Sequence, residues 1–271
     1  MKPFPRAHFT VVMALLLALA LGSGCGSAGV NKGDFNLMSL QDEWALGQKL
    51  AADIERQLPL SQDQAVVGYV NQVGQRIVRH TEMAQMPWTF HVVNDPAINA
   101  FAIPGGHVYV NTGLIAAADS VSELAGVMAH EINHGVARHS TEQLSKAYGL
   151  EILASLVLGQ NPAAYQTILA QIIGGGALAR FSRDAENEAD VLGVRSMYQA
   201  GYDPRGMASM FEELLSREKR SPSSVQRFFS THPLTADRIT KVRAEAQKLP
   251  ARGDLITDDP NYQAIRRKIS S

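Results

Sequence analysis

The stretch "MAHEINHGVARH", Met128 to His139, places three histidines and a glutamate among mostly small or apolar residues. His130 and His134 are four residues apart, so on a helix they lie about 40° from one another and both rings reach one metal ion. Glu131 lies about 100° from His130 and stands beside that ion. In this HExxH pattern the glutamate takes a proton from the water that zinc activates. The stretch predicts one Zn²⁺ per chain, with Glu131 as the catalytic base.

A third protein ligand and an open position for water complete a catalytic zinc site. The segment "ENEAD" offers Glu186 and Asp190, which lie one helical turn apart on one face. We expect Glu186 to bind the metal, and Asp190 to accept a hydrogen bond from a ligating histidine and fix its tautomer. Glu188 lies about 200° from Glu186 and is expected to face elsewhere. The competing interpretation is a solvated acidic helix start, which the helix dipole favours.

The helix that carries the HExxH residues has a clear start signal. Ser120 opens an S-x-x-E capping box, so the helix is expected to run from about Val121 to His139. On such a helix His139 lies about 180° from His130 and does not reach the same metal. Together with Arg138 it is expected to be a cation at the helix end, complementing the dipole.

The remaining periodicities predict an α+β domain that is rich in helix, with a small sheet beside the zinc helix. Residues 39–58 and 61–82 have apolar residues at helical spacing and are expected to form two packed helices. Strands are expected at Trp88–Asp95 and His107–Gly113, with Asn99–Ile103 near an edge of the sheet. A Ser/Pro-rich loop is expected at Ser221–Ser224.

Residues 150–179 are strongly apolar, but Asn161-Pro162 and Gly174–Gly176 interrupt them. These breaks favour a helical hairpin over a membrane span. The hairpin is expected to be buried helix packing. The alternative is a flap over the cleft, hinged at the glycines, or a patch that meets unfolded outer-membrane proteins.

The first 25 residues differ from the rest of the chain. Lys2 and Arg6 precede a short apolar run, Val11 to Gly22, and the small residues that follow end at Cys25. This is the pattern of a cleaved export signal, and Cys25 is expected to be lipidated, as in a bacterial lipobox. The alternative is an ordinary secretory signal with Cys25 incidental.

These boundaries divide the chain into a signal segment at 1–25, a flexible tether at 26–38, a peptidase domain at 39–249, and a tail with a short helix at 250–271. The chain has 25 Lys+Arg against 26 Asp+Glu, a formal net charge of −1, so no nucleic-acid partner is expected.

Five segments, within Leu40–Ala244 and in this order, resemble the HtpX-type zinc metallopeptidases, which include the prenyl-protein CaaX proteases and periplasmic quality-control proteases such as BepA. The segments are "NAFAIPGGHVYVNTGLI", "HEINHGVARH", "FSRDAENEADVLGV", "AGYDPRGM" and "STHPLTADRI". The resemblance implies a zincin-like (gluzincin) fold with zinc held by His130, His134 and Glu186. The transmembrane helices of the membrane members and the helical repeats of BepA have no counterpart here, so the expected kin are small exported lipoproteins.

The resemblance also implies roles for residues outside the zinc helix. His232 and Arg238 are candidates to stabilise the oxyanion. His232 is also a candidate fourth ligand that would leave the enzyme latent, or it only caps the following helix. An edge strand is expected to bind substrate by strand addition, unless it is an internal, fully paired strand; its residues are Asn99, Ala100, Phe101 and Ala102.

The function predicted is an exported endopeptidase, held by lipid in the periplasm at the outer membrane, that cleaves unfolded or misassembled envelope proteins. The outer-membrane assembly machinery is a possible partner. An assembly-factor or chaperone-like lipoprotein with a latent or structural zinc site is the first alternative. A lipid- or wall-binding protein that uses the apolar hairpin is the second.

Overall fold

The computed structural model describes residues 35–175 and 180–270. The expected signal segment, Cys25, most of the expected tether and part of the glycine triplet, Gly176, lie outside the described residues. Within the described residues, no helix combines the length and the apolar character needed to cross a membrane.

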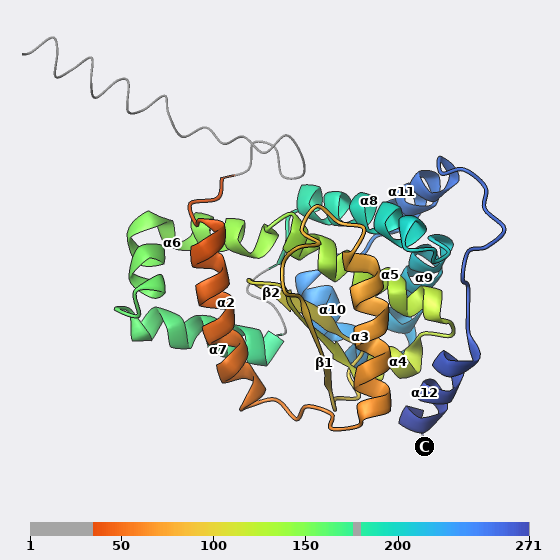
Figure 1. The fold of residues 1–271 in the computed structure, drawn as a ribbon, viewed down its shortest axis with the longest axis horizontal. Helices are drawn as coiled ribbons and strands as arrows, with labels where there is room; N and C mark the ends of the chain where they lie inside the picture. Colours follow the sequence, from red (N-terminus) through yellow and green to blue (C-terminus); the bar gives the residue numbers. More distant parts are fainter. Residues whose placement is uncertain (1–34, 176–179, 271) are drawn as a thin grey trace, which may run out of the picture. The chain divides into compact units, whose positions relative to one another are not determined.

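A three-stranded sheet lies at the centre of the domain (Figure 1), with strand order β1-β3-β2. Strands β1 (Thr89–Val93) and β3 (His107–Asn111) are parallel, and β2 (Ala100–Ile103) is antiparallel to β3. The turn between β2 and β3 uses Gly105 and Gly106, both at positive φ (+84° and +80°), a conformation that glycine adopts without strain. The predicted small sheet is confirmed, and β2 is an edge strand.

Helices surround this sheet. They are α2 (Leu40–Glu55), α3 (Gln64–Val78), α4 (Thr112–Ala117), α5 (Val121–Val136), α6 (His139–Val157), α7 (Pro162–Gly175), α8 (Arg183–Gln199), α9 (Arg205–Arg220), α10 (Pro222–Thr231), α11 (Ala236–Gln247) and α12 (Pro260–Ser270).

Successive side chains along each strand lie on opposite faces of the sheet, and the two faces pack against different helices. Phe90 points toward α3, where a Cβ on Gly74 would lie 2.3 Å from its ring. Tyr109 and Phe101 stack at 4.8 Å on the opposite face and join a core cluster with α2, α6 and α7. In Figure 1, α2, α6 and α7 gather to one side of the sheet and α8, α9 and α11 to the other. The α6–α7 hairpin is therefore largely packing, as expected.

Two predicted boundaries are wrong. The zinc helix α5 ends at Val136, and the new helix α6 begins at His139, because Arg138 between them takes a left-handed conformation with φ of 59°. The segment expected as a loop at Ser221–Ser224 instead opens α10, with Pro222 in its first turn, a position where the missing N–H of proline costs nothing.

The tail packs against the rest of the domain. Tyr262 on α12 is fully buried, and its hydroxyl lies 2.9 and 3.0 Å from the carbonyl oxygens of Ile115 and Ala118, within hydrogen-bond distance of both. These two carbonyls belong to α4 and its C-cap residue. The short helix predicted in the tail is thus fixed beside the start of the zinc helix.

Candidate metal centre

Helix α5 holds the HExxH residues in the most buried part of the domain. Ser120 caps the helix by accepting from the Glu123 N–H, and nearly every residue from Val121 to Val136 is buried. Helix α9 packs closely against α5 at Gly126. A Cβ added to this glycine would lie only 2.6 Å from the Cα of Met207, so only glycine fits here. The rings of His130 and His134 are therefore carried on a helix with little freedom to move.

Four side chains converge at one point. His130 Nε2 lies 3.0 Å from His134 Nε2. Glu186 on α8 places Oε2 3.5 Å from His130 Nε2 and Oε1 3.4 Å from His134 Nε2. His232, which follows α10, places Nδ1 3.0 Å from Glu186 Oε1 and 3.2 Å from His130 Nε2. One ligand atom from each of the four lies within 4.8 Å of the others, and all four residues are buried.

The donor set fits a divalent metal ion. Imidazole nitrogens and a carboxylate oxygen are the ligands that zinc and its first-row neighbours bind in hydrolases. Glu131 Oε1 and His232 Nε2 are also buried without a hydrogen-bond partner and lie 3.4 Å apart. Buried polar atoms of this kind are rare unless a ligand or water completes them. The residues present therefore fit a metal ion and its reactants.

Burial and charge act together on the titratable groups. Burial lowers the pKa of His134 well below its ordinary value, and charge on His130 adds to this effect. Burial disfavours a charged His130 ring, but Asp190 and Glu186 outweigh it and raise its pKa to about 9. Burial raises the pKa of Glu131, against the opposing effect of His232. The negative charges of Asp190 and Glu186 can be balanced either by a proton on His130 or by a bound divalent cation.

Asp190 and Arg238 form the layer behind the ligands. Asp190 Oδ1 lies 2.9 Å from His130 Nδ1, the geometry that the predicted orienting role requires. Arg238 donates to both oxygens of Asp190 at 2.8 Å and also pairs with Glu186. Its guanidinium is thus engaged by two carboxylates, an arrangement that suits a positioning residue better than the oxyanion donor expected from sequence. His232 is the candidate that faces Glu131.

His139 belongs to this site, contrary to the prediction that it is a cation at the helix end. Its Nδ1 lies 2.8 Å from His134 Nδ1, and its Nε2 lies 3.2 Å from a carboxylate oxygen of Glu188. Neither His139 nor Glu188 is among the four residues whose ligand atoms converge, as the helical wheel predicted. The contact of His139 with His134 was not predicted; it arises because the helix ends before His139 and the left-handed Arg138 brings that residue back toward His134.

Arg138 does lie at the end of α5, immediately after the C-cap residue Ala137, and its Nε donates to Glu43 on α2 at 2.6 Å. Phe181 was also missed: its ring stacks on His134 with centroids 4.0 Å apart. The sequence signal that could have indicated Phe181 is its position immediately before Ser182, the N-cap residue of the helix that carries Glu186.

The predicted substrate strand lies next to the base. Glu131 receives a backbone hydrogen bond from Ala102 on β2. Among the described residues, no other strand pairs with the outer edge of β2. The residues Asn99 to Ala102 are buried, but their main chain forms the edge of the sheet. Their role in substrate binding stays a prediction.

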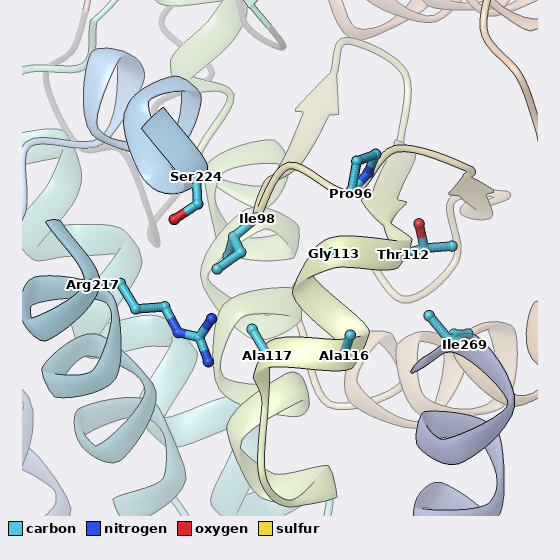
Figure 2. A pocket seen from close by; sticks show the side chains of 9 residues that line it. All are labelled: Pro96, Ile98, Thr112, Gly113, Ala116, Ala117, Arg217, Ser224 and Ile269. Carbon is cyan, nitrogen blue, oxygen red and sulfur yellow. The ribbon is translucent and has the colours of Figure 1, made fainter. Parts of the chain in front are cut away.

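A cavity of about 430 Å³ opens beside the metal ligands, lined by Glu186, Phe181, Arg238 and neighbouring residues of α8 and α11. Figure 2 shows a different pocket, of about 270 Å³, into which Arg217 extends between Ile98 and Ala117. The lining of that second pocket contains no histidine, cysteine or carboxylate, and Arg217 is paired with Glu213. Of these two cavities, only the first is lined by one of the candidate metal ligands, Glu186.

An HExxH helix beside a small sheet, with a glutamate from a later helix completing the ligand set, defines a zincin-like metalloprotease. Comparison with known proteins places it more narrowly. Residues 64–246 match peptidase family M48, and the chain belongs to this family.

Similar proteins include the β-barrel assembly-enhancing protease of Escherichia coli K12, which is 31% identical over 221 residues, 78% of this chain and 45% of that protein. The same protease of Yersinia pestis is 29% identical over 238 residues, 84% of this chain and 49% of that protein. The mitochondrial metalloendopeptidase OMA1 of Schizosaccharomyces pombe is 32% identical over 217 residues, 78% of this chain and 63% of that protein. The chain spans about half the length of the bacterial relatives.

Proposed function

We propose that the protein is an exported, zinc-dependent endopeptidase in which His130, His134 and Glu186 hold the metal and Glu131 is the base. The observation that carries this proposal is the buried convergence of these ligands, with the Glu131 carboxylate beside them. Metal-dependent proteolysis is the established character of the family. The choice of zinc rests on the nitrogen-rich donor set.

The residues of the site supply the remaining chemistry. When bound, zinc would polarise the scissile carbonyl and acidify a water molecule. Glu131 accepts the proton of the attacking water and delivers it to the leaving amine, a task that suits its raised pKa. Asp190 holds the His130 ring, and Arg238 holds Asp190 and Glu186. An extended substrate would pair with the main chain of β2 at residues 99–102.

The proposed setting is the periplasm, with a lipid on Cys25 anchoring the chain to the outer membrane and unfolded or misassembled envelope proteins as substrates. The signal-like first 25 residues support export. The name of the bacterial relatives, β-barrel assembly-enhancing protease, supports the substrate class and the assembly machinery as a partner.

Metal removal tests the proposed function directly. We expect a chelator to abolish cleavage of an unfolded β-barrel protein, and one equivalent of Zn²⁺ to restore it, because the proposed mechanism assigns to zinc both the polarisation of the scissile carbonyl and the acidification of the attacking water. Cleavage should be followed by gel electrophoresis, with zinc content measured on the same samples. Cleavage that persists in zinc-free protein would exclude the zinc mechanism.

A second candidate function is a latent peptidase, or an assembly factor whose metal site is normally closed. One observation favours it: His232 Nδ1 lies among the ligand atoms, 3.0 Å from Glu186 Oε1. In that position the ring would take the coordination site that a catalytic water needs.

Replacing His232 by Ala should therefore raise the rate of cleavage of the unfolded substrate above that of the wild type, with zinc retained. Initial rates and zinc content measured on both proteins check this. The control is His80→Ala, an exposed histidine outside the site, which should leave the rate unchanged. A rate that falls in His232→Ala while zinc stays bound would instead assign His232 to oxyanion stabilisation.

A further inference from the structure

A second group of metal-ligating side chains lies on the face of the sheet that α2 covers. It comprises Glu55 at the end of α2, His91 on β1 and His107 on β3. One carboxylate oxygen and one ring nitrogen from each histidine lie within 4.8 Å of one another. His91 and His107 project to the same face because Thr89 pairs with His107, and His91 with Tyr109, in the parallel register.

Two buried polar atoms, one in this group and one beside it, have no hydrogen-bond partner among the described residues. His107 Nε2 and the hydroxyl of Tyr109 are buried without a hydrogen bond, and both residues are at least nine-tenths buried. The hydroxyl of Thr89 lies 2.7 Å from His107 Nδ1 and 3.0 Å from His91 Nε2. The hydroxyl can donate to one of these rings and accept from the other, so these two ring nitrogens have a partner, whereas His107 Nε2 and the Tyr109 hydroxyl do not. Unpaired buried groups beside two imidazoles and a carboxylate indicate a ligand that is shared among them.

Both histidine rings are in the neutral form that a metal ion requires of its imidazole ligands. Burial lowers the pKa of His107 to about 4, and it also lowers the pKa of His91, partly offset by Glu55. At neutral pH both rings are then uncharged, which is the form that binds a metal. The His91 side chain is 20% exposed and that of Glu55 is 40% exposed, so an ion has access from solvent and can keep water ligands.

We propose that Glu55, His91 and His107 form a second divalent-metal site of the zinc class, in addition to the catalytic one. Two imidazoles and one carboxylate suit Zn²⁺, Ni²⁺ or Cu²⁺ and are a poor match for Ca²⁺ or Mg²⁺. The ion would join the last residue of α2 to β1 and β3. Its effect is therefore on the attachment of α2 to the sheet, independent of peptide hydrolysis.

Zinc stoichiometry tests the site. The full chain, with Glu131→Gln to prevent self-cleavage, is dialysed against buffered Zn²⁺ and its zinc content is measured. We expect two ions per chain, falling to one in His91→Phe and in Glu55→Gln. The phenylalanine keeps the aromatic stack on Tyr109, whose centroid lies 4.8 Å from that of His91. The matched control His80→Gln, at an exposed histidine, should keep two ions.

Two further readouts separate metal binding from a folding defect. Zn²⁺ should shift the ring-nitrogen resonances of His91 and His107 in the parent chain, and it should raise Tm more in His80→Gln than in Glu55→Gln. Equal zinc content in the parent chain, His91→Phe and Glu55→Gln would overturn the proposal. Because cleavage is not the readout, failure here and failure of the proposed peptidase function are distinguishable.

Discussion

Replacing Glu131 by Gln is expected to lower kcat/KM for an unfolded substrate by about 10²- to 10⁴-fold, the usual contribution of a positioned general base. Glutamine keeps the shape and the hydrogen bond from Ala102, but it cannot accept the proton of the attacking water. The loss should appear both in the otherwise wild-type chain and in the His232→Ala background, because the base is needed whether or not His232 regulates the site. Initial rates on one unfolded β-barrel substrate provide the measurement.

Zinc content is the essential companion measurement for this variant. Glu131 is not among the expected ligands, so Glu131→Gln should hold as much zinc as the wild type. Glu151→Gln, the same chemical change at an exposed position on α6, should cleave normally. If Glu131→Gln keeps its zinc and also keeps most of its activity, another group is the base and the mechanism proposed here is wrong.

Replacing Arg238 by Met is expected to destabilise the zinc-free protein by about 3–5 kcal/mol, the usual cost of breaking a buried ion pair from one side. The Arg238 side chain is only 5% exposed and its two partners, Asp190 and Glu186, are buried. Without it, two carboxylates would share the interior with no permanent cation. The free energy of unfolding, from urea titration in the presence of a chelator, provides the measurement.

The same substitution should weaken zinc binding by about 10- to 100-fold, as is usual when a residue that orients a ligand is lost. Arg243→Met is the matched control, because Arg243 lies on the same helix and makes an exposed pair with Glu212. Its effect on unfolding should stay within about 0.5 kcal/mol. Equal destabilisation by both variants would mean that the Asp190–Arg238–Glu186 group does not hold the site together.

The helix that carries the HExxH residues and the candidate metal ligands were predictable because they depend on local periodicity. His130 and His134 share a helix face, Glu186 and Asp190 share another, and Ser120 marks where the first helix begins. The order of the later segments then resembled a known family. That His232 would reach the same point as Glu186 came from the resemblance, since its position depends on how α10 and α11 pack rather than on its own neighbours.

Other features of the site depend on single backbone conformations or on tertiary contacts. Nothing in "GVARH" marks Arg138 as left-handed, because arginine rarely takes positive φ, and so the approach of His139 to His134 was not foreseen. The group of Glu55, His91 and His107 needs two strands in parallel register and the end of a distant helix. No local pattern in the sequence carries that information.

The hydrogen bond from the Ala102 backbone to Glu131 connects the proposed base directly to the strand that is proposed to bind substrate. Ala102 lies on the strand at the edge of the sheet, and Glu131 lies on the helix that carries the metal ligands. Glu131 is thus held in position by the same backbone, that of β2, which would align an extended substrate. A slip of β2 by one residue would move the substrate relative to Glu131, which is carried by α5, so errors in the sheet should reduce turnover as well as binding.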